Sequence, residues 1–285
     1  MRYIDFSMTG LPDSGEKLSA PLQDITADEV SMNLTMCGLL PEYAADLTLL
    51  YSEYGDWNQV KEVWFEESRG DRSTKDSSQK TYRVLVSRYK NAPSTLPNPS
   101  DLPKILNECT TTEDKAQVLY PYLVADDTLF QYVVRKYAQR LNSDILDPLD
   151  FSNETLIGIL DDLEYTDGGS FDYAESTTTR WCEGFRSVMR EIGVLESPQS
   201  LVGHPPSVGD IPLLVSTGYS YEEGDDSWLT SPIGLQYLFQ PEPKWEELYD
   251  RVAETDAWEF FELHGSLELR PIDDTYSWIP EEEIE

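Results

Sequence analysis

Residues 113–141, EDKAQVLYPYLVADDTLFQYVVRKYAQRL, are typical of two consecutive helices in a helical bundle. We expect the first helix from about Glu113 to Val124 and the second over Asp127–Leu141. In the second segment apolar side chains recur at the three- and four-residue spacing that puts them on one face of a helix. These side chains are Phe130, Val133, Val134, Tyr137 and Leu141. A helix of this kind buries its apolar face against other helices, so the stretch favours a mainly α fold.

Helical patterns continue on both sides of this stretch. Further helices are expected over Glu42–Tyr54, from Trp57 to about Glu67, over 77–90, from a cap at Ser152 to about Leu163, and from about Ser176 to Ile192. Gly55 is suited to end a helix and Asp56 to cap the next one. Four prolines in Asn91–Pro103 predict a loop, because proline lacks the N–H that a continuing helix needs. Together these segments predict an all-helical, bundle-like domain over residues 31–196.

The two ends of the chain differ from this middle part. Residues 1–30 are expected to be an N-terminal extension, and the proline- and glycine-rich stretch 197–206 a domain boundary. Residues 207–285 are expected to form a smaller α+β region that ends in an acidic tail. Its patterns predict short helices, the clearest over Trp245–Glu254, and a β-hairpin around His264-Gly265. Helices followed by a hairpin are compatible with a winged-helix-like module.

The charge balance is strongly acidic. Fifty-four Asp and Glu residues face 21 Lys and Arg residues, which gives a net charge of −33. Aromatic residues make up 12% of the chain, and acidic disordered chains lack them, so a folded protein is expected. Acid spread along the whole chain fits a cytoplasm at molar salt, where charge repulsion is screened within about 3 Å. A non-halophilic protein that binds cationic partners is the alternative.

Several classes of function lack their usual sequence signals. The three cysteines are widely spaced and the two histidines have no catalytic neighbours, so no metal site, no cofactor and no enzymatic activity are expected. No GxSxG, phosphate-loop, HExxH or GxGxxG motif is present. The N-terminus lacks the pattern of a signal peptide, and no apolar run reaches the about 20 residues of a membrane span. A cytoplasmic protein with no membrane partner is therefore expected.

One window opposes the acidic background. Residues 69–90 carry seven of the 21 basic residues and only two acidic ones, a net charge of +5. The basic residues are Arg69, Arg72, Lys75, Lys80, Arg83, Arg88 and Lys90. If residues 77–90 are helical, four side chains share an arc of about 80°. These four, which we call the basic stripe, are Lys80, Arg83, Ser87 and Lys90. The opposite face, Tyr82, Leu85, Val86 and Tyr89, can pack into a core.

The basic stripe suits contact with a nucleic-acid backbone. Lysine and arginine neutralise phosphates, and hydroxyl groups such as that of Ser73 can add hydrogen bonds to them. The alternative is that the stripe docks on this protein's own acidic surface or on another acidic protein. Two further basic groups, Arg135/Lys136/Arg140 and Arg180/Arg186/Arg190, are each expected to be structural when taken alone. Two tryptophans without a predicted element, Trp228 and Trp278, are candidates for a partner surface.

Four segments in order resemble the BrxA family of BREX phage-defence systems. They are NLTMCGLLPEYAADLTLLYSEYGDWNQVKEVWFEES (33–68), RSTKDSSQKTYRVLVSRYKNAP (72–93), KAQVLYPYLVADDTLFQYVVRKYAQRL (115–141) and STTTRWCEGFRSVMREIGVLE (176–196). The resemblance implies an all-helical fold similar to the NusB antitermination factors. It also implies a non-catalytic DNA-binding accessory protein. The acidic composition, the N-terminal extension and the proline-rich loop depart from the family pattern.

The resemblance and the charge pattern fall on the same residues. Carried over by position, the family motif reaches Arg72, Ser73, Lys80, Arg83, Lys90, Ser176, Thr179 and Arg180. The expected nucleic-acid-binding set is Arg69, Arg72, Ser73, Lys75, Lys80, Arg83, Lys90 and Arg180, and the expected partners are double-stranded DNA and other BREX subunits. Two alternatives stay open: a protein–protein scaffold subunit that binds no nucleic acid, and a NusB-like RNA binder. Self-association into a homo-oligomer also stays open.

Overall fold

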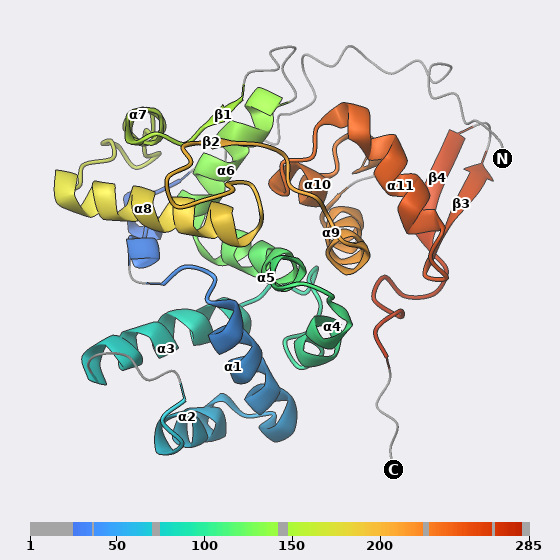
Figure 1. Cartoon of the computed structure of the whole chain (residues 1–285), viewed down its shortest axis with the longest axis horizontal. Helices are drawn as coiled ribbons and strands as arrows, with labels where there is room; N and C mark the ends of the chain where they lie inside the picture. Colours follow the sequence, from blue (N-terminus) through green and yellow to red (C-terminus); the bar gives the residue numbers. More distant parts are fainter. Residues whose placement is uncertain are drawn as a thin grey trace.

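The computed structural model describes residues 25–35, 37–69, 75–141, 148–224, 228–263 and 266–280 (Figure 1). The chain is mainly helical and has a two-stranded hairpin near its C-terminal end, which confirms the expected fold class. The α-helices are α1 (Pro41–Tyr54), α2 (Trp57–Glu66), α3 (Lys75–Lys90), α4 (Leu102–Glu108), α5 (Thr112–Asp126), α6 (Thr128–Leu141), α7 (Asn153–Asp161), α8 (Glu175–Glu191), α9 (Asp210–Glu223), α10 (Ile233–Tyr237) and α11 (Trp245–Ala253). The short 3-10 helices are η2 (Ala27–Glu29), η3 (Asn33–Thr35), η4 (Trp228–Thr230) and η5 (Glu242–Lys244). The strands are β1 (Leu149–Asp150), β2 (Val202–Gly203), β3 (Trp258–Leu263) and β4 (Ser266–Pro271).

Helix α5 lies at the centre of the fold. Every side chain from Ala116 to Val124 is buried, so this helix is enclosed on all sides. Helices α1, α3, α6, α8 and α9 all contact it. The segment 113–141 therefore forms the middle of the bundle, as its pattern predicts.

The predicted helix ends are confirmed by their caps. Gly55 ends α1 in the left-handed region, with φ 66°. Asp56 then caps α2, because its carboxylate accepts the backbone N–H groups of Asn58 and Gln59 at 2.6 and 3.2 Å. The hydroxyl of Ser152 caps α7 in the same way, through the N–H of Thr155 at 3.3 Å. A cap of this type stabilises its helix by about 1 kcal/mol.

Two helices differ from the sequence-based expectation. The predicted loop Asn91–Pro103 is wrong at its end, because α4 begins at Leu102 and contains Pro103 in its first turn. The N–H groups of a first turn have no intrahelical partner, so proline is tolerated there. The second difference is α9, which is 14 residues long, whereas short helices were expected. Pro212 lies in its first turn for the same reason.

The expected boundary 197–206 is tied to the helical part of the chain. In an antiparallel pair, Leu149 of β1 faces Gly203 of β2 and Asp150 faces Val202. The side-chain amide of the buried Gln117 donates hydrogen bonds to the carbonyl groups of Ile192 and Ser207, at 3.0 and 2.8 Å. The chain on both sides of this stretch is therefore fixed against α5 and β1.

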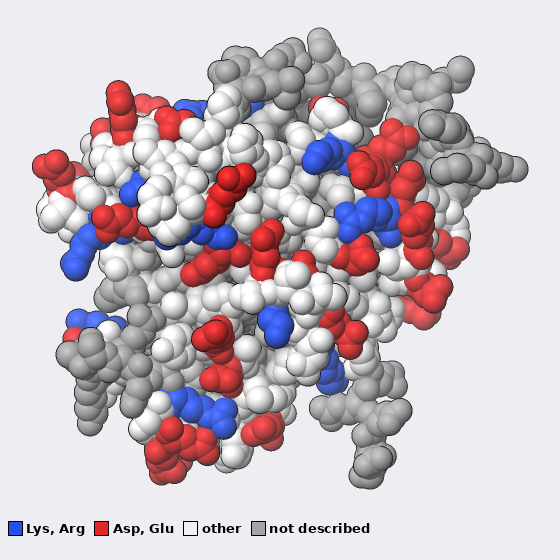
Figure 2. All heavy atoms as spheres, viewed as in Figure 1, with Lys and Arg blue, Asp and Glu red and all other residues white. Residues whose placement is uncertain are grey.

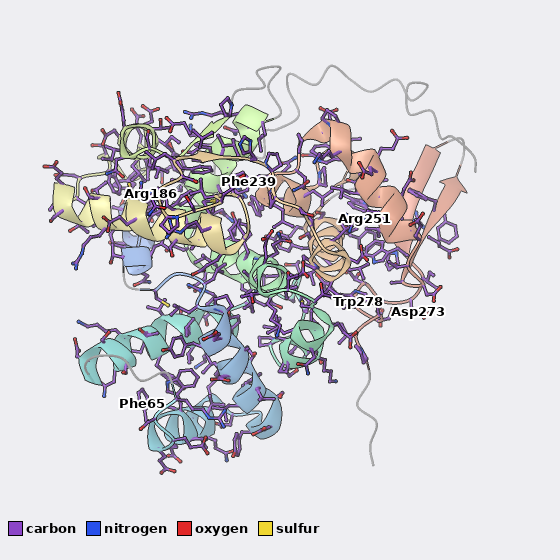
Figure 3. All side chains as sticks on the ribbon, viewed as in Figure 1. Phe65, Arg186, Phe239, Arg251, Asp273 and Trp278 are labelled. Carbon is purple, nitrogen blue, oxygen red and sulfur yellow. The ribbon has the colours of Figure 1, made fainter. Side chains whose placement is uncertain are left out.

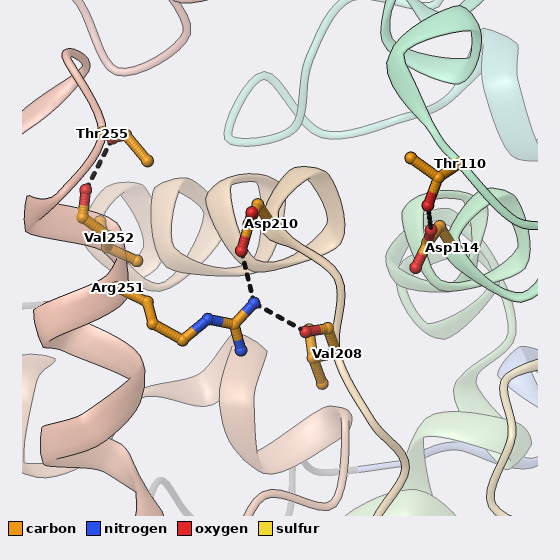
Figure 4. A network of polar contacts seen from close by, with 7 residues as sticks. All are labelled: Thr110, Asp114, Val208, Asp210, Arg251, Val252 and Thr255. Carbon is orange, nitrogen blue, oxygen red and sulfur yellow. Dashed lines mark hydrogen bonds and ion pairs between the residues drawn. The ribbon is translucent and has the colours of Figure 1, made fainter.

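One hydrophobic core extends from the first helices to the hairpin. Helix α9 packs against α5, and α10 packs against α6, so the C-terminal region shares its core with the bundle. Arg251 of α11 adds a polar link, because its guanidinium donates to the carbonyl of Val208 at 3.0 Å and to the Asp210 carboxylate at 2.5 Å (Figure 4). The domain boundaries at residues 30, 196 and 207 stay a prediction within this continuous core.

The C-terminal region turns its aromatic side chains inward. The Trp228 ring lies 6.2 Å from that of Trp258 and 5.9 Å from that of Tyr249. Trp228 is buried and is therefore part of the core, not of a partner surface. The exposed side of α11 carries Glu246, Glu247 and Asp250, and acidic side chains predominate over α11 and the adjoining hairpin in Figure 2. This acidic surface is unsuited to binding phosphate. The comparison of the region with a winged-helix-like module stays a prediction.

Candidate nucleic-acid interface

Helix α3 has the two faces that its sequence predicts. Tyr82, Leu85 and Tyr89 are buried, while Lys80, Arg83 and Lys90 are exposed. Its apolar face packs against α5 and α1. Aromatic contacts fix its first half, because the Tyr82 ring lies 5.8 Å from Trp64 and 5.1 Å from Phe65 of α2.

The cations of the basic stripe differ in their partners. Lys80 forms an ion pair with Asp76, one helical turn earlier, at 2.8 Å. Such a surface pair contributes only about 0.3–0.5 kcal/mol, so an anionic ligand can replace it. Arg83 donates weakly to the Gln79 carbonyl at 3.5 Å. Within the described part of the chain, Arg83 and Lys90 form no ion pair with a carboxylate.

Ser87 lies differently from the other members of the stripe. It is half-buried, and its hydroxyl donates to the Asp126 carboxylate at 3.5 Å. The side chain of Asn91 donates to the same hydroxyl at 3.2 Å. Within the basic stripe, Ser87 therefore contacts an acidic group of this protein, Asp126, while Arg83 and Lys90 on either side of it face solvent.

The segment before α3 is only partly described. Arg69 follows α2, and its Nε contacts the Glu67 carboxylate at 2.6 Å. Arg72 and Ser73 lie outside the described residues. Lys75 begins the backbone of α3, but its side chain is outside the description. Of the expected set, the structure thus brings Lys80, Arg83 and Lys90 together on one helix face.

Arg180, the remaining member of the expected set, lies on α8. It is exposed in the second turn of that helix, and Ser176 is also exposed there. The first turns of α3 and α8 point to the same side of the molecule (Figure 1). Arg180 and the start of the basic stripe therefore lie near the N-terminal ends of two helices that face the same side of the molecule.

In the other two basic groups, Arg135, Lys136 and Arg186 have partners within the fold. Arg135 donates to the Tyr237 hydroxyl at 2.9 Å, and Lys136 lies over the Tyr132 ring at 5.3 Å. Arg186 of α8 donates to the Phe151 carbonyl at 3.3 Å and to the Asn153 side chain at 2.7 Å (Figure 3). Arg135 and Arg186 thus join neighbouring elements within the fold.

A buried ionic cluster behind the stripe is not among the sequence-based expectations. Arg88 of α3 is only 1% exposed, and its guanidinium donates to the Gly38 carbonyl at 3.1 Å. Its charge acts to lower the pKa of three nearby carboxyl groups, those of Asp126, Asp127 and Glu191. We call these four residues the Arg88 cluster. Arg88 lies four residues after Val84 and seven after Thr81, both buried, and this spacing is the one sequence signal for its inward direction.

Burial dominates the electrostatics of the Arg88 cluster. It raises the pKa of Asp127 to about 6, although the Phe130 N–H and Arg88 act in the opposite direction. It also raises the pKa of Asp126 and of Glu191, again against the attraction of Arg88. Desolvation disfavours the charged form of a carboxyl group, and one arginine does not fully offset it for three carboxylates.

The remaining titratable groups bear on two further kinds of site, a metal site and a site with a reactive thiol. No group of three or more His, Cys, Asp or Glu side chains there could hold a metal ion. Burial raises the pKa of the Cys109 and Cys182 thiols to about 12 and about 11, which makes them poor nucleophiles. Among the helices that the structure describes, none is both long and apolar enough to cross a bilayer.

Comparisons with protein-family models, curated proteins and solved structures found no match to this chain.

Proposed function

We propose that this chain binds duplex DNA through its phosphate backbone, as a non-catalytic accessory component of a BREX-type anti-phage defence system. The observation that carries the proposal is the exposed basic face of α3 in a chain of net charge −33. The order of the four sequence segments that resemble the BrxA family supports the same reading. Other subunits of the defence system are the proposed protein partners.

Three cations are available for phosphate contacts. Arg83, Lys90 and Arg180 are exposed and form no ion pair with the carboxylates that the structure describes. Lys80 can join them once its pair with Asp76 opens. Contacts of this kind position a protein on DNA but carry no base-sequence information, so the proposal includes no sequence preference.

High salt limits this binding but does not abolish it. Counterion release makes the affinity fall as salt rises, with a slope of about −0.9 for each neutralised phosphate. The same salt shortens the range of repulsion from the acidic surface to about 3 Å at 1 M. A local cationic face can therefore dock while the distant acidic side, over α11 and the hairpin (Figure 2), repels DNA only weakly.

A second candidate function is a protein–protein scaffold. Three contacts favour it, because acidic groups of this chain already accept basic or hydroxyl groups of the window: Glu67 with Arg69, Asp76 with Lys80, and Asp126 with Ser87. An acidic partner protein would use the same chemistry. This scaffold would co-purify with its partner and would show no affinity for DNA.

The test is fluorescence anisotropy of labelled duplex DNA, single-stranded DNA and single-stranded RNA over a KCl series. The test variant is Arg83→Glu/Lys90→Glu. The matched control is Lys244→Glu/Arg270→Glu, which changes the net charge equally at exposed sites away from α3. Circular dichroism at each KCl concentration verifies that every variant is folded.

The proposal expects the duplex to bind and the stripe variant to lose most of that affinity, with a salt slope smaller by about 2. The control should bind like the unmodified protein. No binding by folded protein at any KCl concentration would reject DNA binding in favour of the scaffold. Preferential binding of single-stranded RNA would point to the NusB-like alternative.

A further inference from the structure

One peptide group connects the two helices that carry the proposed phosphate contacts. The Gly38 carbonyl accepts a hydrogen bond from Arg88 of α3 at 3.1 Å. Gly38 itself lies against α8, where the Val188 and Glu191 side chains are beside it. Arg88 therefore ties α3 to a residue that packs against α8.

The residue after this peptide group is strained. Leu40 has φ 50° and ψ 61°, a left-handed conformation that is unfavourable for a residue with a branched side chain. It leads directly into Pro41, the first residue of α1. Strain of this kind persists only where the surroundings fix the backbone. The hydrogen bond from Arg88 to the Gly38 carbonyl supplies such a restraint.

Two polar atoms of this site have no hydrogen-bond partner among the described residues. They are Arg88 Nε and Glu191 Oε2, and both atoms are buried. Titratable or charged groups face the site from each element around it: Asp126 of α5, Asp127 before α6, Tyr89 of α3, Arg190 of α8 and Cys37. Removal of Arg88 leaves the buried Asp127 and the half-buried Asp126 and Glu191 without the cation that they share.

We propose that Arg88 is a positioning residue for DNA binding. Through the Gly38–Leu39 peptide it fixes α3 against α8, and so sets the distance between Lys90 and Arg83 on one helix and Arg180 on the other. Lys90 follows Arg88 by two residues, so a shift of Arg88 moves this phosphate contact with it. The inference rests on the proposed function, because it assigns a role in DNA binding to a residue that cannot touch DNA.

The experiment measures the spacing of the two helices without DNA and the affinity for DNA separately. Spin labels are attached at Gln79→Cys on α3 and Ser176→Cys on α8, both exposed, in a Cys109→Ser background. The other two cysteines are buried, and protein without the introduced cysteines verifies that they take up no label. Distance distributions come from double electron–electron resonance, and affinity from duplex anisotropy on the unlabelled variants.

Arg88→Met is the test variant and Arg186→Met is the matched control. Arg186 is also an arginine that bonds to a backbone carbonyl, but it holds Phe151 and Asn153 of α7 and not the Gly38–Leu39 peptide. We expect Arg88→Met to broaden the distance distribution and to weaken duplex binding about tenfold, the equivalent of one charge-assisted contact. Arg88→Lys keeps a cationic donor and should restore much of both. Arg186→Met should leave the distance unchanged.

Three results would overturn the inference. One is an unchanged distance distribution and affinity in folded Arg88→Met, and another is a broadened distribution with unchanged affinity. The third, no duplex binding by the unmodified protein, would reject the proposed function as well, and the distance data would then still report on the peptide contact alone. If Arg88→Met does not fold, Glu191→Ala removes the α8 carboxylate that lies beside Gly38 and gives the same readouts.

Discussion

Charged side chains are rarely enclosed in a fold without a close match of opposite charge, and Asp127 is an exception. Its carboxylate caps α6 by accepting the Phe130 N–H at 3.0 Å, and the Ser31 hydroxyl reaches it at 3.4 Å. Arg88 is shared with the half-buried Asp126 and Glu191, so its attraction does not offset the burial of Asp127. The ionised form of Asp127 therefore lowers the stability of the fold.

We predict that Asp127→Asn stabilises the protein at pH 7.5. The pKa of Asp127 is raised from 3.8 to about 6 in the fold, so between these values the folded state holds a proton that the unfolded chain releases. The free energy of unfolding of the unmodified protein therefore falls as pH rises through this window, by up to about 3 kcal/mol. Asparagine keeps the oxygen that caps α6 but carries no charge. The free energy of unfolding of the variant therefore does not fall in this pH window.

Urea denaturation at a fixed KCl concentration, at pH 7.5 and at pH 4.5, measures the difference. The advantage of the variant should shrink toward zero at the lower pH, where Asp127 is protonated in the folded protein. A variant less stable than the unmodified protein at pH 7.5 would mean that attraction to Arg88 outweighs the effect of burial.

At the scale of elements, the amphipathic helices were predictable, and of the two enclosed helices α5 was predicted nearly in full and α9 was not. α1, α2, α6 and α8 alternate apolar and polar residues at helical spacing, and the structure has them close to the predicted residues. α9 is buried from Pro212 to Ser220, so its sequence has no polar face to reveal its period.

Part of the candidate site was also predictable from the sequence and part was not. The exposed cations of α3 follow from its period, because the face of one helix depends only on local spacing. The surroundings of Arg88 do not, since Gly38, Asp126 and Glu191 are far from it along the chain. Only the packing of α3, α5 and α8 brings these groups together.

Arg251→Met is predicted to weaken the attachment of α11 to the start of α9. The variant loses the hydrogen bonds to Val208 and Asp210 (Figure 4) and leaves a carbonyl without its donor, which lowers the free energy of unfolding by about 1–3 kcal/mol. Arg270→Met is the control, because Arg270 is exposed and its ion pair within the described part of the chain is with Glu268 on its own strand. Its cost should stay within about 0.5 kcal/mol. Equal effects of the two variants in urea denaturation would contradict the assigned role of Arg251.

The whole molecule is predicted to unfold in one step. α9 and α10 bury the faces of α5 and α6, so neither part of the core stays closed without the other. Urea denaturation followed by far-ultraviolet circular dichroism and by tryptophan fluorescence should give coincident transitions. Two separated transitions would instead support independent folding of residues 31–196 and 207–285.

The enclosure of α5 also affects how fast its backbone amide protons exchange with solvent. Its backbone N–H groups from Ala116 to Val124, except at Pro121, which has none, are surrounded by buried side chains and by α1, α3, α6, α8 and α9. Local fraying cannot expose them, so their protons exchange with deuterium only through global opening of the protein. The slowest-exchanging amides should therefore cluster on this helix, and their exchange rates give the frequency at which the whole molecule opens.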